Sequence, residues 1–181
     1  MFRRARRILR GIPAPAAPQA LRHAHQLMER GRYADALLTF YDLAQKAEER
    51  FPERAPILYA EAGRAAILSG DSKKGVFCFR SALTLLGSQQ RYQRLQQLGG
   101  RIVMELRERG LHAEAEEVES VLRNNLPAAA QKEAKPSSYH QVILPTHCPS
   151  CGAAVRREDV EWVDALTAEC DYCGSPIRAE S

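Results

Sequence analysis

Four of the five cysteines of this chain form two Cys-x-x-Cys pairs near its C-terminal end. The pairs are Cys148 with Cys151 and Cys170 with Cys173, and a glycine directly follows each pair. Two intervening residues let a tight turn present both sulfur atoms to one ion, and two such pairs, 18 residues apart (152–169), complete a tetrahedral set. The glycine permits the turn and brings backbone N–H groups toward the thiolates. The spacing therefore predicts a metal centre, without which so short a segment could not fold.

Residues 145–178 resemble a zinc ribbon because of these two cysteine pairs. The resemblance implies one structural Zn²⁺ held by the four cysteines, with no catalytic residue and no other cofactor. Catalytic zinc usually keeps an open position beside three protein ligands, whereas four cysteines close the coordination shell. We expect His147, next to Cys148, to be exposed or to support the site from outside the shell. Iron in the same four sulfurs, as in rubredoxins, is the less favoured alternative, because only Trp162 and Tyr172 are aromatic nearby.

The residues between the two pairs predict a small β-hairpin. We expect a first strand piece over 153–156, a second over 160–163, a turn over 164–166 and a return strand over 167–169. Trp162 is the largest apolar side chain of the segment, so we expect it to supply most of the apolar cover.

Three glycines in the middle of the chain recur at a nearly constant interval. Gly31, Gly70 and Gly110 are 39 and 40 residues apart, and each separates two segments in which apolar residues have helical spacing. Glycine ends a helix at low cost because it adopts the left-handed conformation without Cβ strain. A small residue five positions later would let the next helix pack closely; these residues are Ala36, Gly75 and Ala115. A fixed period of this size indicates stacked helix–turn–helix units.

Residues 18–123 resemble the tetratricopeptide repeat (TPR) family, a solenoid of antiparallel helix pairs. The matching residues are Ala24, Leu27, Gly31, Ala36, Phe40 and Leu43 in the first unit, Tyr59, Gly63, Gly70, Gly75, Phe79 and Ala82 in the second, and Val103, Leu106, Gly110, Ala115 and Leu122 in the third. The third unit departs from the pattern, because Glu119 stands where the family has an aromatic residue. The resemblance implies three helix pairs with a short concave groove for a protein or peptide partner. A plain six-helix bundle is the alternative.

The predicted fold is therefore mainly α, with antiparallel helix-turn-helix repeats followed by a small β zinc-ribbon module. Cys78 lies between two phenylalanines in a helical segment, so we expect it to be a small buried apolar residue. His23, His25 and His112 are isolated on helical segments, and we expect ordinary packing or surface roles for them.

The segments outside these two regions differ in charge and composition. Residues 1–17 are predicted to be a flexible tail, and the first ten of them contain five arginines. This tail could bind nucleic acid or lie on an anionic membrane surface, but a solvated tail is the simpler interpretation. Residues 124–144 contain Pro127 and Pro136, are followed directly by Pro145, and are predicted to be a linker. Residues 145–181 carry a net charge of −4, from three basic and seven acidic side chains, which disfavours phosphate binding by the ribbon.

The sequence as a whole predicts a cytoplasmic, non-enzymatic adaptor for protein partners. Clustered cysteines in a chain without a visible signal peptide favour a reducing compartment. No apolar stretch is long enough to predict a transmembrane segment. Two alternatives from other classes remain: an electron carrier with iron in the four-cysteine site, and a nucleic-acid-binding protein that uses the arginine-rich N-terminus.

Overall fold

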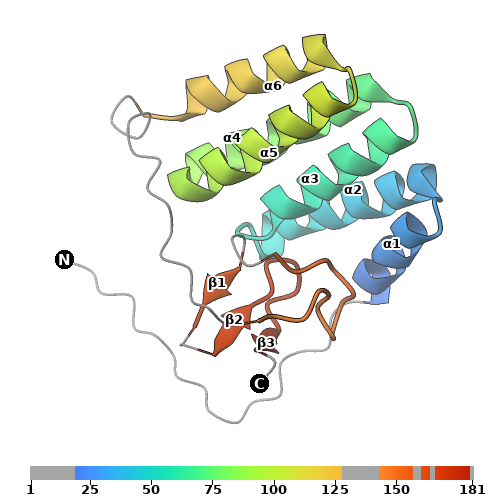
Figure 1. The fold of residues 1–181 in the computed structure, drawn as a ribbon, viewed down its shortest axis with the longest axis vertical. Helices are drawn as coiled ribbons and strands as arrows, with labels where there is room; N and C mark the ends of the chain where they lie inside the picture. Colours follow the sequence, from blue (N-terminus) through green and yellow to red (C-terminus); the bar gives the residue numbers. More distant parts are fainter. Residues whose placement is uncertain (1–18, 128–142, 157–159, 164–165, 180–181) are drawn as a thin grey trace.

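The computed structural model describes residues 19–127, 143–156, 160–163 and 166–179. The predicted basic tail and most of the predicted linker lie outside these residues. The described chain is mainly α, as predicted, with six helices packed against one another (Figure 1). The helices are α1 (Gln19–Glu29), α2 (Tyr33–Arg50), α3 (Ala55–Leu68), α4 (Ser72–Ser88), α5 (Tyr92–Glu108) and α6 (His112–Asn125).

The three periodic glycines end α1, α3 and α5. Gly31, Gly70 and Gly110 have φ angles of +70°, +90° and +76°, the left-handed conformation expected of them. In each turn the glycine N–H and the following N–H donate to carbonyl groups of the preceding helix, at 2.9–3.1 Å. The turn from α4 to α5 has the same two hydrogen bonds, but there Gln90 takes the left-handed position with φ +58°. The turn geometry thus recurs at a fourth position, where the sequence has no glycine to indicate it.

Small residues let α3 and α4 pack closely. A Cβ atom on Gly63 would lie 2.6 Å from the Phe79 ring, and one on Gly75 would lie 2.6 Å from Ile67 Cδ1. Both distances are too short for carbon–carbon contact, so each glycine leaves room for one large side chain from the facing helix. Cys78, in α4, is fully buried, as predicted.

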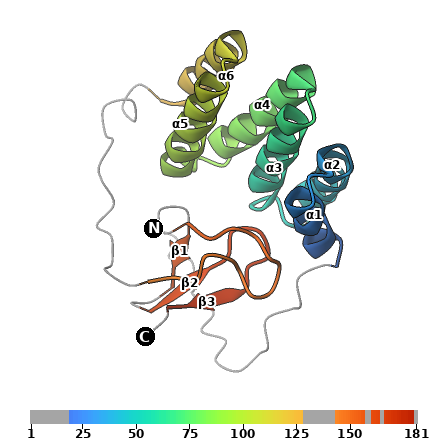
Figure 2. The ribbon, with the colours of Figure 1, turned by 45° about the vertical axis from the view of Figure 1, so that its right-hand side comes forward.

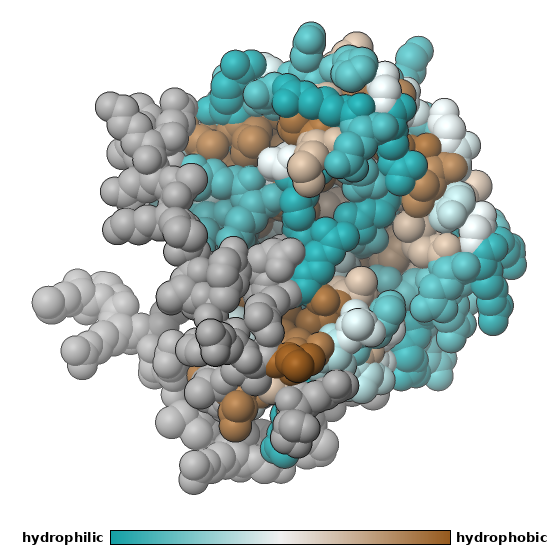
Figure 3. All heavy atoms as spheres, in the orientation of Figure 1, coloured by the Kyte–Doolittle hydropathy of each residue, from teal (hydrophilic) through white to brown (hydrophobic). Residues whose placement is uncertain are grey.

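Each helix packs on the next one along the chain, and α6 also packs on α4 (Figures 1 and 2). The helical face seen in Figure 3 is mainly hydrophilic, with scattered apolar side chains. Within the described residues, no helix combines the length and the apolar character needed to cross a membrane.

The C-terminal part of the structure, here called the cysteine module, comprises residues 143–156, 160–163 and 166–179. It contains a three-stranded antiparallel sheet of β1 (Glu161–Trp162), β2 (Thr167–Glu169) and β3 (Pro176–Arg178), with β2 in the centre. The β1–β2 hairpin confirms the prediction from sequence. The predicted strand over 153–156 is wrong: in the described chain this segment contributes only a bridge from Ala154 to His147.

Apolar cover in the module comes mainly from residues that the sequence did not indicate. Trp162 is only half-buried, whereas Ile177 on β3 is 1% exposed and Ala168 on β2 is fully buried. The expectation that Trp162 provides most of this cover is therefore wrong. The four paired cysteines and Ile177 instead belong to the same buried cluster as the helix interiors, so the helices cover one side of the module.

Candidate metal centre

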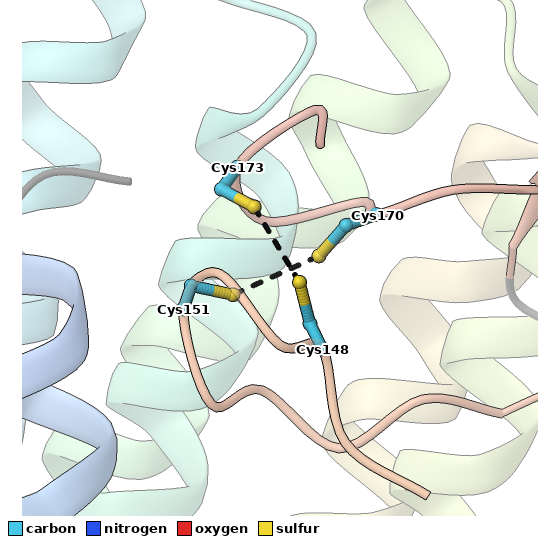
Figure 4. Close-up of side chains that lie close together, drawn as sticks. All are labelled: Cys148, Cys151, Cys170 and Cys173. Atoms are coloured by element: carbon cyan, nitrogen blue, oxygen red, sulfur yellow. Dashed lines mark hydrogen bonds between the residues drawn. The ribbon is translucent and has the colours of Figure 1, made fainter. Parts of the chain in front are cut away.

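The four paired cysteines converge on one point between two loops (Figure 4). The Sγ atoms of Cys148 and Cys173 are 3.8 Å apart, those of Cys151 and Cys170 are 3.7 Å apart, and all four lie within 4.8 Å of one another. Four sulfurs at about 2.3 Å from a tetrahedral zinc ion would lie about 3.8 Å from one another. The sulfur arrangement is thus of the right size for one metal ion.

All four thiols are free and buried. The four residues are between 1% and 3% exposed, and none forms a disulfide. Sulfur–sulfur distances near 3.7 Å are far longer than the bond of about 2.05 Å in a disulfide. Four like ligands enclose the centre, so the site can hold a metal ion and offers no protein-defined opening for a substrate.

The two cysteine pairs have the same backbone structure. In the first, the Gly152 N–H donates to the Cys148 carbonyl at 2.9 Å; in the second, the Gly174 N–H donates to the Cys170 carbonyl at 2.8 Å. Both glycines have positive φ, +77° and +71°. These turns explain why glycine follows each pair in the sequence, because other residues adopt this conformation only with strain.

The residue after each glycine directs its N–H group at the second sulfur of the pair. The N–H of Ala153 lowers the pKa of Cys151, and the N–H of Ser175 lowers that of Cys173. These contributions are smaller than the effect of proton sharing among the thiols. Hydrogen bonds from the thiols of Cys151 and Cys170 hold the pKa of Cys173 well below its usual range, and the same sharing raises the pKa of Cys151. A bound cation would stabilise all four thiolates together.

The second cysteine pair also connects the module to the helices. Its two inner residues are Asp171 and Tyr172, and both contact the side formed by α1, α3 and α5, which Figure 2 shows above the module. The Asp171 carboxylate forms an ion pair with Arg94 on α5. The Tyr172 hydroxyl donates to the Glu61 carboxylate on α3 at 2.9 Å.

His25 on α1 completes this contact region. Its ring packs edge-on against Tyr172, at a centroid distance of 5.2 Å, and against Phe40, at 5.1 Å. The residue is 8% exposed, and its Nε2 atom has no hydrogen-bond partner in the described structure. Burial lowers the pKa of His25 despite the opposing effect of nearby Glu61. The ring is therefore kept neutral beside the cysteine cluster.

The structure brings together the four residues that the sequence proposed as metal ligands. His147 is exposed, lies 3.1 Å from the Thr146 hydroxyl through Nδ1, and is not one of the grouped ligands. The sequence did not identify His25, Glu61 or Arg94 as neighbours of the site. The arginine-rich N-terminus, the alternative nucleic-acid or membrane contact, lies outside the described residues.

Comparisons with protein-family models, curated proteins and solved structures gave no significant match for this chain. The four-cysteine group, which could hold a metal ion, is therefore the feature from which a function must be argued.

Proposed function

We propose that this chain is a non-enzymatic protein–protein adaptor in which a TPR-like helical stack carries a zinc ribbon with one structural Zn²⁺. The single observation that carries the proposal is the closed, buried set of four sulfurs with edges of 3.7 and 3.8 Å. Such a set suits a tetrahedral structural zinc, whose role is to hold two loops together.

The helical part supports the adaptor role. In each of the three helix pairs, a glycine with positive φ forms the turn between the two helices, and small residues allow close packing between α3 and α4. Stacked pairs of this kind present side chains of their first helices on one common face. Residues of α1, α3 and α5 form the face that receives the cysteine module. A reducing compartment such as the cytoplasm suits the five free thiols.

Native mass spectrometry of the untagged protein, purified gently from its own host, tests the proposal. We expect one zinc ion per chain, together with the mass of a bound protein partner. A Cys151→Ser variant should lose the zinc. A protein without metal would contradict the zinc site. Iron with the visible absorption of an iron–thiolate centre would favour the electron-carrier alternative, since the same four sulfurs accept either metal.

A further inference from the structure

The two cysteine pairs share one backbone structure but differ in what lies between the cysteines. In the first pair, Pro149 is exposed, and neither Pro149 nor Ser150 forms a hydrogen bond or ion pair to a helix within the described chain. In the second pair, Asp171 and Tyr172 both bind helix side chains. Metal binding requires only the turn, so the contacts of the second pair are an additional property of this chain.

The helices offer a separate partner for each of these two side chains. The guanidinium group of Arg94 faces the carboxylate of Asp171, in an ion pair whose side chains are 25% and 12% exposed. Glu61 is 5% exposed and accepts the Tyr172 hydroxyl, while Arg64 compensates its charge at 2.8 Å. A buried carboxylate aimed at a phenol hydroxyl distinguishes tyrosine from phenylalanine, because without the hydroxyl the carboxylate would lose a partner.

A third position also restricts what can bind. Gly174 has a φ of +71°, a conformation that favours glycine, and a Cβ atom there would meet only the movable end of a side chain, Nη2 of Arg54 just before α3, at 2.3 Å. The helical face therefore suits a tight turn with the pattern Asp-Tyr-x-Gly. The His25 ring packs edge-on against the Tyr172 ring and so forms part of the surface that contacts the aromatic side chain.

The fit between module and helices is incomplete. A cavity of about 50 Å³ remains between them, lined by apolar residues such as Leu98 and Ile177 and by charged residues such as Arg64. The contacts of Asp171 and the Tyr172 hydroxyl with the helices are ionic and polar, whereas the four cysteines and Ile177 join the buried cluster of the helices. Imperfectly filled, polar contacts of this kind are typical of interfaces that open and close.

From these contacts we infer that His25, Glu61 and Arg94 form a recognition site for an acidic–aromatic turn of the Asp-Tyr-x-Gly type. The chain's own Asp171 and Tyr172 occupy the site in this structure. A partner protein that presents the same turn binds by displacing the cysteine module. The inference deepens the proposed adaptor function and rests on it, because it names the chemistry of the partner.

A peptide of this chain's residues 167–178 is the probe, with the sulfurs of its two cysteines joined by a methylene bridge that keeps the turn and cannot exchange thiols. Its affinity for the full-length, zinc-loaded protein is measured by fluorescence anisotropy. We expect Tyr172→Ala in the protein to tighten peptide binding at least tenfold, since the module no longer competes. Asp171→Lys, which repels Arg94, should have the same effect. The matched control Pro149→Ala changes the corresponding place in the first pair and should bind as wild type does.

Two further variants test the recognition itself. Adding Arg94→Glu to Tyr172→Ala should abolish the gain, and a peptide with phenylalanine in place of tyrosine should bind several-fold more weakly than the parent. Equal binding by the wild type and both module variants, or no effect of Arg94→Glu, would overturn the inference. Zinc per chain is measured on every sample. Absence of zinc would contradict the proposed metal site, while the peptide affinities would still decide whether the helical face recognises the turn.

Discussion

The five cysteines of this chain occupy two different chemical environments. Cys78 is enclosed by apolar side chains of the helices, and burial raises the pKa of its thiol to about 11. The thiol is therefore protonated at neutral pH and unreactive. The other four lie beside one another, where each sulfur becomes a better ligand once a cation replaces the shared protons.

Replacing one ligand should therefore have a different effect from replacing Cys78. We expect Cys170→Ala to reduce bound metal from one ion per chain to a level near zero, because three sulfurs hold zinc far more weakly than four. The six helices should stay folded. Metal analysis and far-ultraviolet circular dichroism measure the two effects.

The matched control is Cys78→Ala, which should keep its metal and cost about 1 kcal/mol of stability through the small cavity that it leaves. Full metal occupancy in Cys170→Ala would show that this sulfur is not a ligand.

His25 should make stability depend on pH. Because burial keeps its folded-state pKa below the ordinary 6.5, the unfolded chain takes up this proton first as the pH falls. The contribution of neutral His25 to the free energy of unfolding is thus present above about pH 6.5 and is lost as the pH falls through the pKa of His25 in the folded state. For one proton, the free energy of unfolding can change by at most about 1.4 kcal/mol per pH unit.

A His25→Phe variant should remove this part of the pH dependence while keeping an aromatic ring against Phe40 and Tyr172. Urea unfolding of both zinc-loaded proteins between pH 7.5 and 5.5 measures the difference, since acid release of the metal affects both. Parallel pH profiles for the two proteins would contradict the explanation.

The four candidate metal ligands could be predicted from sequence because each cysteine pair is local: four consecutive residues fix both sulfurs of a pair. His25, Glu61 and Arg94 could not, because they are far apart in the sequence and meet the module only after the helices have stacked. Glu61 and Arg64 are the charged residues of the largely apolar α3, and the role of Glu61 depends on Tyr172, 111 positions away.

At the scale of elements, the helices could be predicted from the spacing of apolar residues and from the glycines that end them, because both signals are local in the sequence. The third strand, β3, was missed because Pro176 opens it and three residues are too few for alternation to show. Pro56 does not interrupt α3: it lies in the first turn of this helix, where its missing N–H has no helical partner to lose.

The contact between α3 and α4 gives a prediction at this scale. Gly63→Ala should lower stability by about 1–3 kcal/mol, because the added methyl group would meet the Phe79 ring at 2.6 Å in a packed core. Gly100→Ala on α5 is the matched control: it has nothing within 4 Å and should raise stability by up to about 1 kcal/mol through better helix propensity. Urea denaturation midpoints of the two variants should move in opposite directions, and a neutral Gly63→Ala would show that the helices separate easily.

At the scale of the whole molecule, the linker prediction left open whether the two parts touch. They share one buried cluster, and the acidic module lies against Arg94 on α5 and Arg54 just before α3. The charge difference between the two parts was visible in the sequence, but the docking surface was not, because it is built from three helices. A metal ion bound by the four cysteines would therefore stabilise the module and also position the turn that holds it on the helical face.

Removing the metal should consequently loosen the helices at a distance from the ion. When a chelator extracts the metal, the turn around Asp171 and Tyr172 loses its shape, and α3 and α5 lose their ionic and hydrogen-bonded partners. We expect hydrogen exchange at α3 and α5 to become at least tenfold faster, which corresponds to about 1.4 kcal/mol of local stability. Mass spectrometry of peptic fragments measures this rate.

The helix α6 is the internal control, because it lies at the opposite end of the molecule from the sheet (Figure 1). Its exchange should stay unchanged on chelation, and added zinc should restore protection of α3 and α5. If only the cysteine module lost protection, the two parts would be energetically independent despite their contact. If α6 also exchanged faster, the metal would stabilise the whole stack, and the helical face could not be uncovered without partial unfolding.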